Sequence, residues 1–143
     1  MLVEITISAT EIAEDMQMDV VLDQKKLLSS TCKTESQTVT YDVPDDAGEH
    51  CLQVVLSNKL AKHTCVDNEN QILTDVMGRV DRIVLDEIDC TDIFCSGLEC
   101  YQHNINGNGK MFTDQFYGLL GCNGTASFEF TTPIHLWFLK QAL

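Results

Sequence analysis

Four residues between positions 90 and 103 have side chains that bind zinc. Cys90, Cys95, Cys100 and His103 follow one another as C-x4-C-x4-C-x2-H, and three thiolates with one imidazole complete a tetrahedral ligand set. Structural zinc sites, however, bring their ligands in close pairs on tight turns, and no second pair follows in this stretch. The spacing is a weak zinc signal, and we expect no bound metal.

A run of carboxylates lies beside these cysteines. Asp86, Glu87, Asp89 and Asp92 offer the oxygen ligands that calcium prefers, but calcium needs about six to eight of them. Neighbouring residues on a strand point to opposite faces, so Asp86 and Glu87 could share an ion only across a bulge or turn. A solvated acidic sheet edge is the simpler interpretation. The oxygen-rich stretch 67–70 lacks the ligand spacing of an EF-hand and is interpreted as a turn.

The sequence contains no motif that predicts catalysis. With 22 Asp and Glu residues in a chain of 143, some pair spaced for glycoside hydrolysis is unavoidable, so acid pairs do not discriminate. His50, His63, His103 and His135 lie in no nucleophile motif such as G-x-S-x-G, and the stretch 107–110 is too short for a phosphate-binding loop. We expect a protein that is not an enzyme; a hydrolase of surface polysaccharide is the least favoured alternative.

Aromatic residues cluster in the second half of the chain. Phe112, Phe116 and Tyr117 follow a stretch rich in glycine and asparagine, and Trp137 lies in an apolar run that begins at Ile134. A tryptophan in such a run is better explained by burial in a core or an interface than by a platform for sugars. We expect these five residues to contribute to an apolar surface that docks on another protein.

Composition limits the partners. Nine Lys and Arg against 22 Asp and Glu give a net charge of −13, so the field of the protein repels phosphate backbones and anionic membranes. No window contains the roughly 18 apolar residues of a membrane span, and the first residues do not resemble a secretory leader. We expect a soluble chain that is not secreted and binds neither nucleic acid, nor membrane, nor a cofactor. Its seven cysteines are then expected to be free thiols.

Alternating apolar residues predict a series of short strands. Met16, Met18, Val20 and Leu22 recur with the period of two that places side chains on one face of a sheet. Residues that favour turns separate this run from similar runs elsewhere. Strands are predicted at 1–8, 16–22, 25–28, 36–43, 50–57, 79–88 and 125–131, with a short strand at 71–74 inside the polar connection 58–78.

The remaining segments complete an all-β prediction. Residues 95–109 are predicted as a loop or tight hairpin turn, and residues 134–139 are expected to pair with the strand 125–131 across a hinge at Pro133. The best helix candidate, 10–16, spans only about two turns. Many short strands without a helical stripe predict a single antiparallel β-sandwich of the jelly-roll type, with little helix, over residues 1–143.

Three segments resemble the strand order of β-sandwiches of the carbohydrate-binding-module type. Residues 19–27 (DVVLDQKKL) resemble a strand that ends in a V-D-G-K turn, residues 36–58 resemble the following strand pair, and residues 81–89 (DRIVLDEID) resemble a later L-y-V-D-y-I-x-I-d-G strand. The resemblance covers roughly half of the chain and implies the sandwich fold. The chain departs from the pattern at Gln24, where those modules have a turn glycine, and at Cys90, which follows Asp89.

The end of the chain carries a second resemblance. Residues 123–139 (NGTASFEFTTPIHLWFL) are similar to the F-T-T-P-x-Y-L-W-L-L ending of small virion-associated proteins of contractile-tailed cyanobacterial phages. That resemblance implies an accessory or structural protein of a phage particle, either a capsid decoration or a tail protein. Such a protein is assembled in the host cytoplasm and present on the particle in several copies, bound to other virion proteins. The alternative is a carbohydrate-binding module that recognises a host surface glycan, with its dependence on calcium left open.

Overall fold

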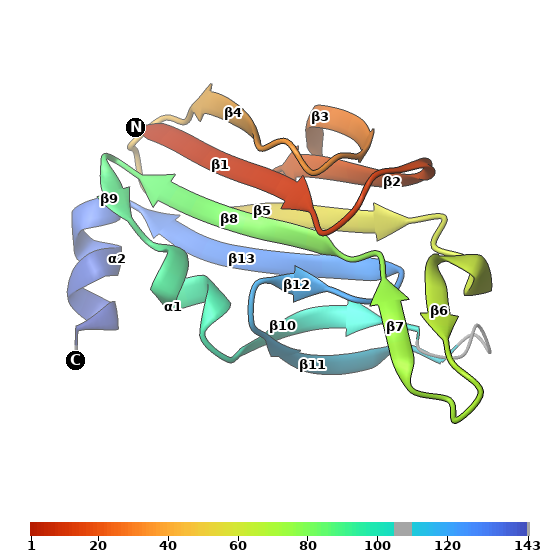
Figure 1. Cartoon of the computed structure of the whole chain (residues 1–143). Coiled ribbons are helices and arrows are strands. Elements are labelled where there is room, and N and C mark those ends of the chain that lie inside the picture. Colours follow the sequence, from red (N-terminus) through yellow and green to blue (C-terminus); the bar gives the residue numbers. More distant parts are fainter. Residues whose placement is uncertain (105–109, 143) are drawn as a thin grey trace.

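The computed structural model describes residues 1–104 and 110–142, which consist mainly of short strands (Figure 1). In chain order the elements are β1 (Leu2–Ala9), β2 (Ala13–Leu22), β3 (Lys25–Cys32), β4 (Gln37–Asp42), β5 (Gly48–Ser57), a 3-10 helix (Ala61–His63), β6 (Thr64–Val66), β7 (Ile72–Asp75), β8 (Gly78–Leu85), β9 (Ile88–Asp89), α1 (Thr91–Cys95), β10 (Leu98–His103), β11 (Phe112–Phe116), β12 (Leu119–Leu120), β13 (Gly124–Thr132) and α2 (Ile134–Gln141).

Two antiparallel sheets form a sandwich, with β1 and β8 lying across β5 and β13 (Figure 1). The five-stranded sheet has the order β12-β8-β1-β4, with β9 beside β8, and the six-stranded sheet has the order β11-β10-β13-β5-β2-β3. The strands β6 and β7 form a separate hairpin that projects from the sandwich, and we call it the arm. The predicted antiparallel β-sandwich with little helix is therefore confirmed.

The core lies between the two sheets and follows the period-two pattern of the sequence. Met16, Met18, Val20 and Leu22 of β2 are at most 2% exposed, as expected for alternate residues of a strand that faces another sheet. Their partners across the sandwich include Ile5 of β1, which is 1% exposed. The outer face of the six-stranded sheet carries the polar residues that lie between these core positions.

The predicted strand 79–88 is interrupted where an irregularity was expected. Asp86 and Glu87 have φ values of 52° and 67°, and Asp23 and Gln24 have φ values of 50° and 69°. Two consecutive left-handed residues are typical of a type I′ turn, which joins antiparallel strands tightly. The first pair connects β8 to β9 and the second connects β2 to β3. Gln24 thus occupies a left-handed position without being glycine.

The segment 134–139 was predicted to pair as a strand with 125–131, and this prediction is wrong. The residues form the helix α2, which begins after Pro133. Ile134, Trp137 and Phe138 recur at helical spacing, and the Trp137 ring stacks on Phe94 with 5.6 Å between centroids. A short apolar run has the same appearance in a buried strand and in a short helix. Within the described residues, no helix is long and apolar enough to span a membrane.

Two other local predictions are also corrected. The stretch 95–109, predicted as a loop or turn, contains the strand β10, while the turn expected at Gly107 lies among residues outside the described ranges. The stretch 10–16, the best helix candidate in a sequence that predicts little helix, is not helical, because β2 already begins at Ala13. The short strand predicted at 71–74 is confirmed, since β7 covers Ile72–Asp75.

Candidate functional site

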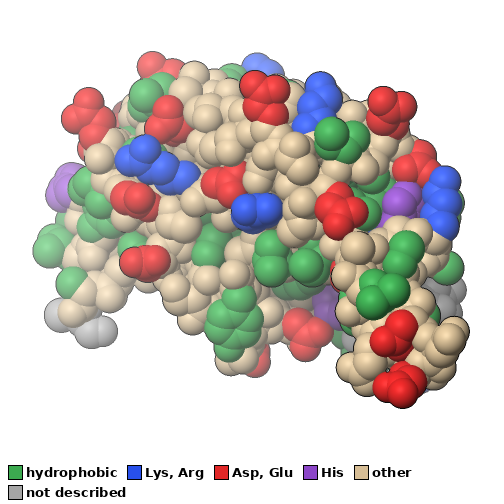
Figure 2. All heavy atoms as spheres, viewed as in Figure 1, with side chains coloured by type: hydrophobic (Ala, Val, Ile, Leu, Met, Phe, Trp, Pro, Cys, Tyr) green, Lys and Arg blue, Asp and Glu red, His purple; other side chains and the backbone are tan. Residues whose placement is uncertain are grey.

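A cleft opens where the six-stranded sheet extends past the smaller sheet, between the hairpin β10–β11 and β12. We call it the β10–β11 cleft, and its volume is about 560 Å³. Its lining residues are Glu99, Tyr101, His103, Thr113, Asp114, Gln115, Tyr117 and Leu119. In this part of the molecule, Figure 2 shows hydrophobic side chains gathered near β12 and a surface that is hollowed next to the arm. The cleft combines aromatic rings with carboxylate, amide and hydroxyl groups.

The pairing of β10 with β11 brings the main polar groups of the cleft together. Tyr101 lies opposite Asp114, and His103 lies opposite Phe112. Directly opposed residues of an antiparallel pair point to the same face. The register therefore places the carboxylate of Asp114 beside the two rings of β10, although eleven residues separate it from His103 along the chain.

Asp114 and His103 form a close pair on this face. His103 Nε2 lies 2.5 Å from Asp114 Oδ2, and its N–H donates to this oxygen, while no described residue binds the other carboxylate oxygen. The imidazole is held by its neighbours, because its centroid lies 4.7 Å from that of Tyr101 and 6.5 Å from that of Phe112. His103 is 4% exposed, and its Nδ1 has no hydrogen-bond partner among the residues that the structure describes. The buried ring thus holds one oxygen of a carboxylate whose side chain is 57% exposed.

Tyr101 forms the floor of the cleft and is bound to the loop before β13. Its hydroxyl donates to the carbonyl oxygen of Cys122 and accepts the Cys122 N–H at 3.0 Å. Burial raises the pKa of Tyr101 to about 12, so the phenol remains neutral at physiological pH. The hydroxyl of Tyr101 thus donates one hydrogen bond and accepts one, both within the protein. Tyr101 therefore supports the cleft with its ring and does not offer its hydroxyl to a ligand.

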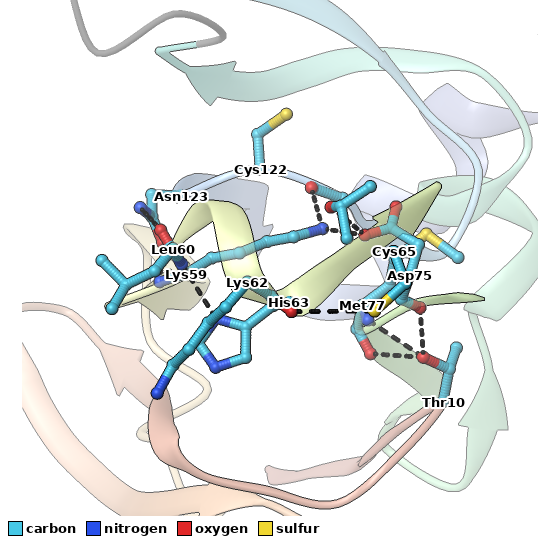
Figure 3. A network of polar contacts seen from close by, with 12 residues as sticks. Thr10, Lys59, Leu60, Lys62, His63, Cys65, Asp75, Met77, Cys122 and Asn123 are labelled. Atoms are coloured by element: carbon cyan, nitrogen blue, oxygen red, sulfur yellow. Dashed lines mark hydrogen bonds and ion pairs between the residues drawn. The ribbon is translucent and has the colours of Figure 1, made fainter. Parts of the chain in front are cut away.

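The same loop is anchored from the base of the arm (Figure 3). Lys59 Nζ donates to the carbonyl oxygen of Gly121 at 2.7 Å and contacts Asp75 Oδ1 at 2.5 Å. The backbone N–H of Lys59 donates to Asn123 Oδ1 at 2.7 Å. The Lys59 side chain is only 9% exposed, and a charge in such a place is stabilised by pairing. The arm and the cleft floor therefore share one fixed loop.

Tyr117 supplies an exposed aromatic ring at the rim of the cleft. Its side chain is 66% exposed, and its hydroxyl donates to Gln115 Oε1 at 3.0 Å. Phe112 and Leu119 are each 41% exposed. A largely exposed ring whose polar end is held by a neighbour is suited to stacking on a ligand.

The predicted docking residues separate into two groups. Phe116, Ile134 and Trp137 are 0%, 2% and 7% exposed and belong to the core, so they offer little surface to a docking partner. Phe116 faces inward by strand alternation, and α2 buries the other two against the sandwich. Phe112 and Tyr117 remain exposed, and their part in a docking surface stays a prediction.

A second hollow, of about 910 Å³, lies on the outer face of β5 and β13 beside α2; we call it the α2 hollow. Its lining residues are Asp23, Gln24, Glu49, His50, Cys51, Gln53, Glu129, Phe130, Thr131 and Trp137. At its edge, His50 Nδ1 lies 2.7 Å from Asp23 Oδ2, and its Nε2 lies 3.1 Å from Thr132 Oγ1. This order of carboxylate, imidazole and hydroxyl is that of hydrolases.

The hydrogen-bonded groups of Asp23, His50 and Thr132 are nevertheless suited to holding strands together and not to catalysis. Asp23 Oδ1 accepts the backbone N–H of Cys51 at 2.8 Å, so both oxygens of this carboxylate have partners. Thr132 is 5% exposed, and its hydroxyl contacts the carbonyl oxygen of Asp46. A nucleophile must reach the substrate, and this hydroxyl is enclosed. The groups clamp the β2–β3 turn to β5 and β13.

The cysteines considered as zinc ligands do not converge with His103. Cys90 is fully buried, and its Sγ contacts the carbonyl oxygen of Ile88 at 3.3 Å. Burial raises the pKa of Cys90 to about 11 and that of Cys95 to about 12, which disfavours the thiolate that binds metals. Throughout residues 1–104 and 110–142, no three His, Cys, Asp or Glu side chains lie close enough to hold a metal ion. The zinc arrangement is therefore not formed.

The carboxylates considered as calcium ligands are also separated. Asp89 Oδ1 accepts the backbone N–H of Thr91 at 2.9 Å and its hydroxyl at 2.6 Å, and these two hydrogen bonds lower the pKa of Asp89. In the stretch 67–70, Asp67 Oδ1 accepts the backbone N–H groups of Glu69 and Gln71. The latter arrangement is a turn, as predicted from the sequence.

Only some of the residues that line the β10–β11 cleft could be identified from the sequence. Tyr117 and Phe112 were singled out as aromatic residues after a turn-rich stretch, but Asp114 and Gln115 were not. An alternating pattern at 112–116 would have placed Asp114 on the side of Phe112 and Phe116. The partner strand β10 was interpreted as a loop, so the approach of Asp114 to His103 had no basis in the sequence.

Comparison with known proteins establishes the fold. No protein-family model and no curated protein matches the sequence. Among solved structures, vCBM60 in complex with galactobiose is 14% identical, with a TM-score of 0.50, and the alignment covers 90% of this chain and 97% of that one. A selenomethionine form of vCBM60, from work on two families of calcium-dependent carbohydrate-binding modules, is 15% identical, with a TM-score of 0.53 over 89% of this chain and 88% of that one.

These similarities confirm the expected resemblance to carbohydrate-binding modules at the level of the fold. They do not bear on the resemblance to phage proteins, which stays a prediction. The chain therefore has the β-sandwich architecture of the carbohydrate-binding module vCBM60.

Proposed function

We propose that this protein binds carbohydrate in the β10–β11 cleft and carries out no reaction on it. The observation that carries this proposal is that the exposed ring of Tyr117, the amide of Gln115 and the carboxylate of Asp114 line one cleft. Carbohydrate recognition combines stacking on an aromatic face with hydrogen bonds to hydroxyl groups. The similarity of the fold to a module that was solved with galactobiose supports the same choice.

Each of these residues has a distinct part in the proposed site. The face of Tyr117, 66% exposed, packs against the C–H groups of one sugar ring. Asp114 Oδ1 accepts a sugar hydroxyl, because its other oxygen is held by His103. Gln115 uses its amide nitrogen as a donor, since its oxygen accepts the Tyr117 hydroxyl. His103 positions Asp114 and does not itself contact the ligand.

The arrangement supports binding without catalysis. A general base activates a nucleophile or a water that it contacts directly. His103 faces Asp114 through Nε2, and its Nδ1 is buried without a partner among the described residues. No hydroxyl or thiol therefore completes a relay in the cleft.

The role in a phage particle that the sequence suggests stays a second prediction. The exposed side chains of Phe112 and Tyr117 would serve protein docking as well as sugar stacking. The location can be tested separately, because mass spectrometry of purified particles would detect a virion protein. Its absence from particles would remove that role and leave glycan binding unaffected.

A glycan array tests the proposed function directly. Wild-type protein is compared with Tyr117→Ala, and Leu73→Ala serves as the control because Leu73 is 65% exposed on the arm, outside the cleft. We expect wild type and the control to retain the same glycans and Tyr117→Ala to lose them. An array without bound glycans, or equal binding by all three proteins, would contradict the proposal.

A further inference from the structure

We infer that the β10–β11 cleft recognises an uncharged glycan by direct hydrogen bonds, without a calcium ion between protein and sugar. This inference rests on the proposed function and adds the class of ligand and the mode of recognition. The compared module belongs to a calcium-dependent group, so the inference separates this chain from proteins of similar fold. It depends on where the carboxylates of this chain lie and what they bind.

Every residue that could supply a charged calcium ligand lies within the described ranges. The sequence has 22 Asp and Glu residues, and none of them falls at 105–109 or 143. Calcium requires about six to eight oxygen ligands, with several carboxylates converging on one point. Within the described residues, no three acidic, histidine or cysteine side chains converge in this way. In the described part of the chain, the cluster of carboxylates on which a calcium site is built is therefore not assembled.

Many aspartates are instead bound by groups of the protein itself. Asp15 faces Lys62 Nζ at 2.5 Å and His63 Nε2 at 2.8 Å, one at each carboxylate oxygen. Asp75 Oδ1 contacts Lys59 Nζ and accepts the Thr64 hydroxyl at 2.8 Å. Cationic and N–H groups thus occupy positions around these carboxylates that a calcium ion would need.

In the cleft, Asp114 is likewise bound by a group of the protein, and one oxygen of this carboxylate is left to accept from a ligand. His103 Nε2 lies against Asp114 Oδ2 at 2.5 Å, so a buried imidazole stands where a cation would bridge the carboxylate. Glu99 is the second acidic residue of the lining, across the strand pair from Gln115. Two carboxylates, one of them already bound, favour direct acceptance of sugar hydroxyl groups over coordination of a metal.

Charge determines the class of glycan. Among the described residues, the lining of the cleft includes Glu99 and Asp114 but no Lys or Arg, and the whole chain has a net charge of −13. A cleft lined by one sign of charge repels ligands of the same sign. Uronic acids and sulfated sugars are therefore disfavoured, and neutral oligosaccharides fit the lining.

The test is a glycan array that contains neutral, uronic-acid and sulfated oligosaccharides, probed with the full chain in EDTA and again in excess CaCl2. We expect neutral glycans to be bound in both buffers, with affinities that differ by less than about twofold. Binding that requires calcium, or binding confined to acidic glycans, would overturn the inference while leaving the proposed function intact. The absence of any bound glycan in both buffers would instead reject the proposed function.

A pair of charge-matched variants locates the contact. Asp114→Asn removes the free carboxylate acceptor, and Asp46→Asn makes the same change at an exposed residue outside the cleft. For a neutral glycan in EDTA, we expect about tenfold weaker binding for Asp114→Asn and unchanged binding for Asp46→Asn. Equal affinities of folded Asp114→Asn and wild type would overturn the direct contact. The far-ultraviolet circular dichroism and melting temperature of each variant establish that it is folded.

Discussion

Three Asp–His pairs occur in the described part of this protein, and only the pair in the β10–β11 cleft keeps an acceptor for a ligand. In the α2 hollow, Asp23 binds His50 through one oxygen and the Cys51 N–H through the other. At the base of the arm, Asp15 likewise has a partner at each oxygen. In the cleft, one oxygen of Asp114 has a partner among the described residues, and the carboxylate is 57% exposed.

The difference shows that proximity of an acid and an imidazole does not define a functional site. The two saturated pairs connect strands or fix a turn, and their carboxylates have no oxygen left for another molecule. The pair in the cleft, which keeps one free oxygen, lines the same cleft as Tyr117, a residue that is 66% exposed. We therefore assign a structural role to the larger hollow and the proposed binding site to the smaller cleft, although a choice by volume alone would favour the larger hollow.

The largest expected effect is a difference in stability between variants of Phe116 and Tyr117, two adjacent residues that were both predicted to belong to a docking surface. Phe116→Ala empties a site that is 0% exposed and should lower the free energy of unfolding by about 3–5 kcal/mol. Tyr117→Ala removes an exposed ring and should change that free energy by less than about 0.5 kcal/mol. Urea denaturation followed by tryptophan fluorescence measures both values. Similar values for the two variants would show that Phe116 is not a core residue.

A smaller loss of stability is expected in the α2 hollow. His50→Ala leaves Asp23 and Thr132 without their common partner and should lower the free energy of unfolding by about 1–3 kcal/mol. Glycan affinity should remain at the wild-type level, because the clamp lies outside the cleft. Loss of binding in a variant that is still folded would place the ligand in the α2 hollow and contradict the comparison.

The exposed ring is expected to matter for affinity and not for stability. Tyr117→Ala should weaken binding of a neutral glycan by about tenfold, which corresponds to about 1.4 kcal/mol. Tyr117→Phe keeps the ring and removes the hydroxyl that binds Gln115, so it should retain most of the affinity. Isothermal titration calorimetry distinguishes the two variants. Equal losses in both would assign the contact to the hydroxyl.

The smallest effect concerns the pH dependence of the pair at the base of the arm. Hydrogen bonds from Lys62 and His63 lower the pKa of Asp15 from 3.8 to about 2. A carboxyl whose pKa is lower in the folded state stabilises the fold above pH 4, and this contribution disappears as the pH falls towards 2. Asp15→Asn should therefore flatten the acid-induced loss of stability in that range. An unchanged pH profile of the melting temperature would contradict the assignment.

The sequence predicted the sandwich better than it predicted the site. The core face of β2 was predicted correctly from the alternation of Met16, Met18, Val20 and Leu22. A strand that is buried on one side has apolar residues at every second position, and this pattern can be recognised in the sequence. The segment of Trp137 was placed in a strand because six apolar residues do not distinguish a short helix from a buried strand.

The β10–β11 cleft was harder to predict from the sequence, because its geometry depends on the register between two strands. Asp114 and His103 meet through the pairing of β10 with β11, and no local pattern in either strand specifies that pairing. The exposed Tyr117 and the buried Phe116 are neighbours in the sequence and are both aromatic, so both were predicted to belong to the docking surface. The strand alternation that separates them is visible only when the limits of β11 are known.

The most direct test is an NMR titration of isotope-labelled protein, in EDTA, with a neutral oligosaccharide that the glycan array retains. We expect saturable chemical-shift changes at the amides of Asp114, Gln115 and Tyr117, and unchanged signals for Glu49, His50 and Glu129 in the α2 hollow. Changes confined to the α2 hollow, or changes that arise only after calcium is added, would contradict direct recognition in the β10–β11 cleft.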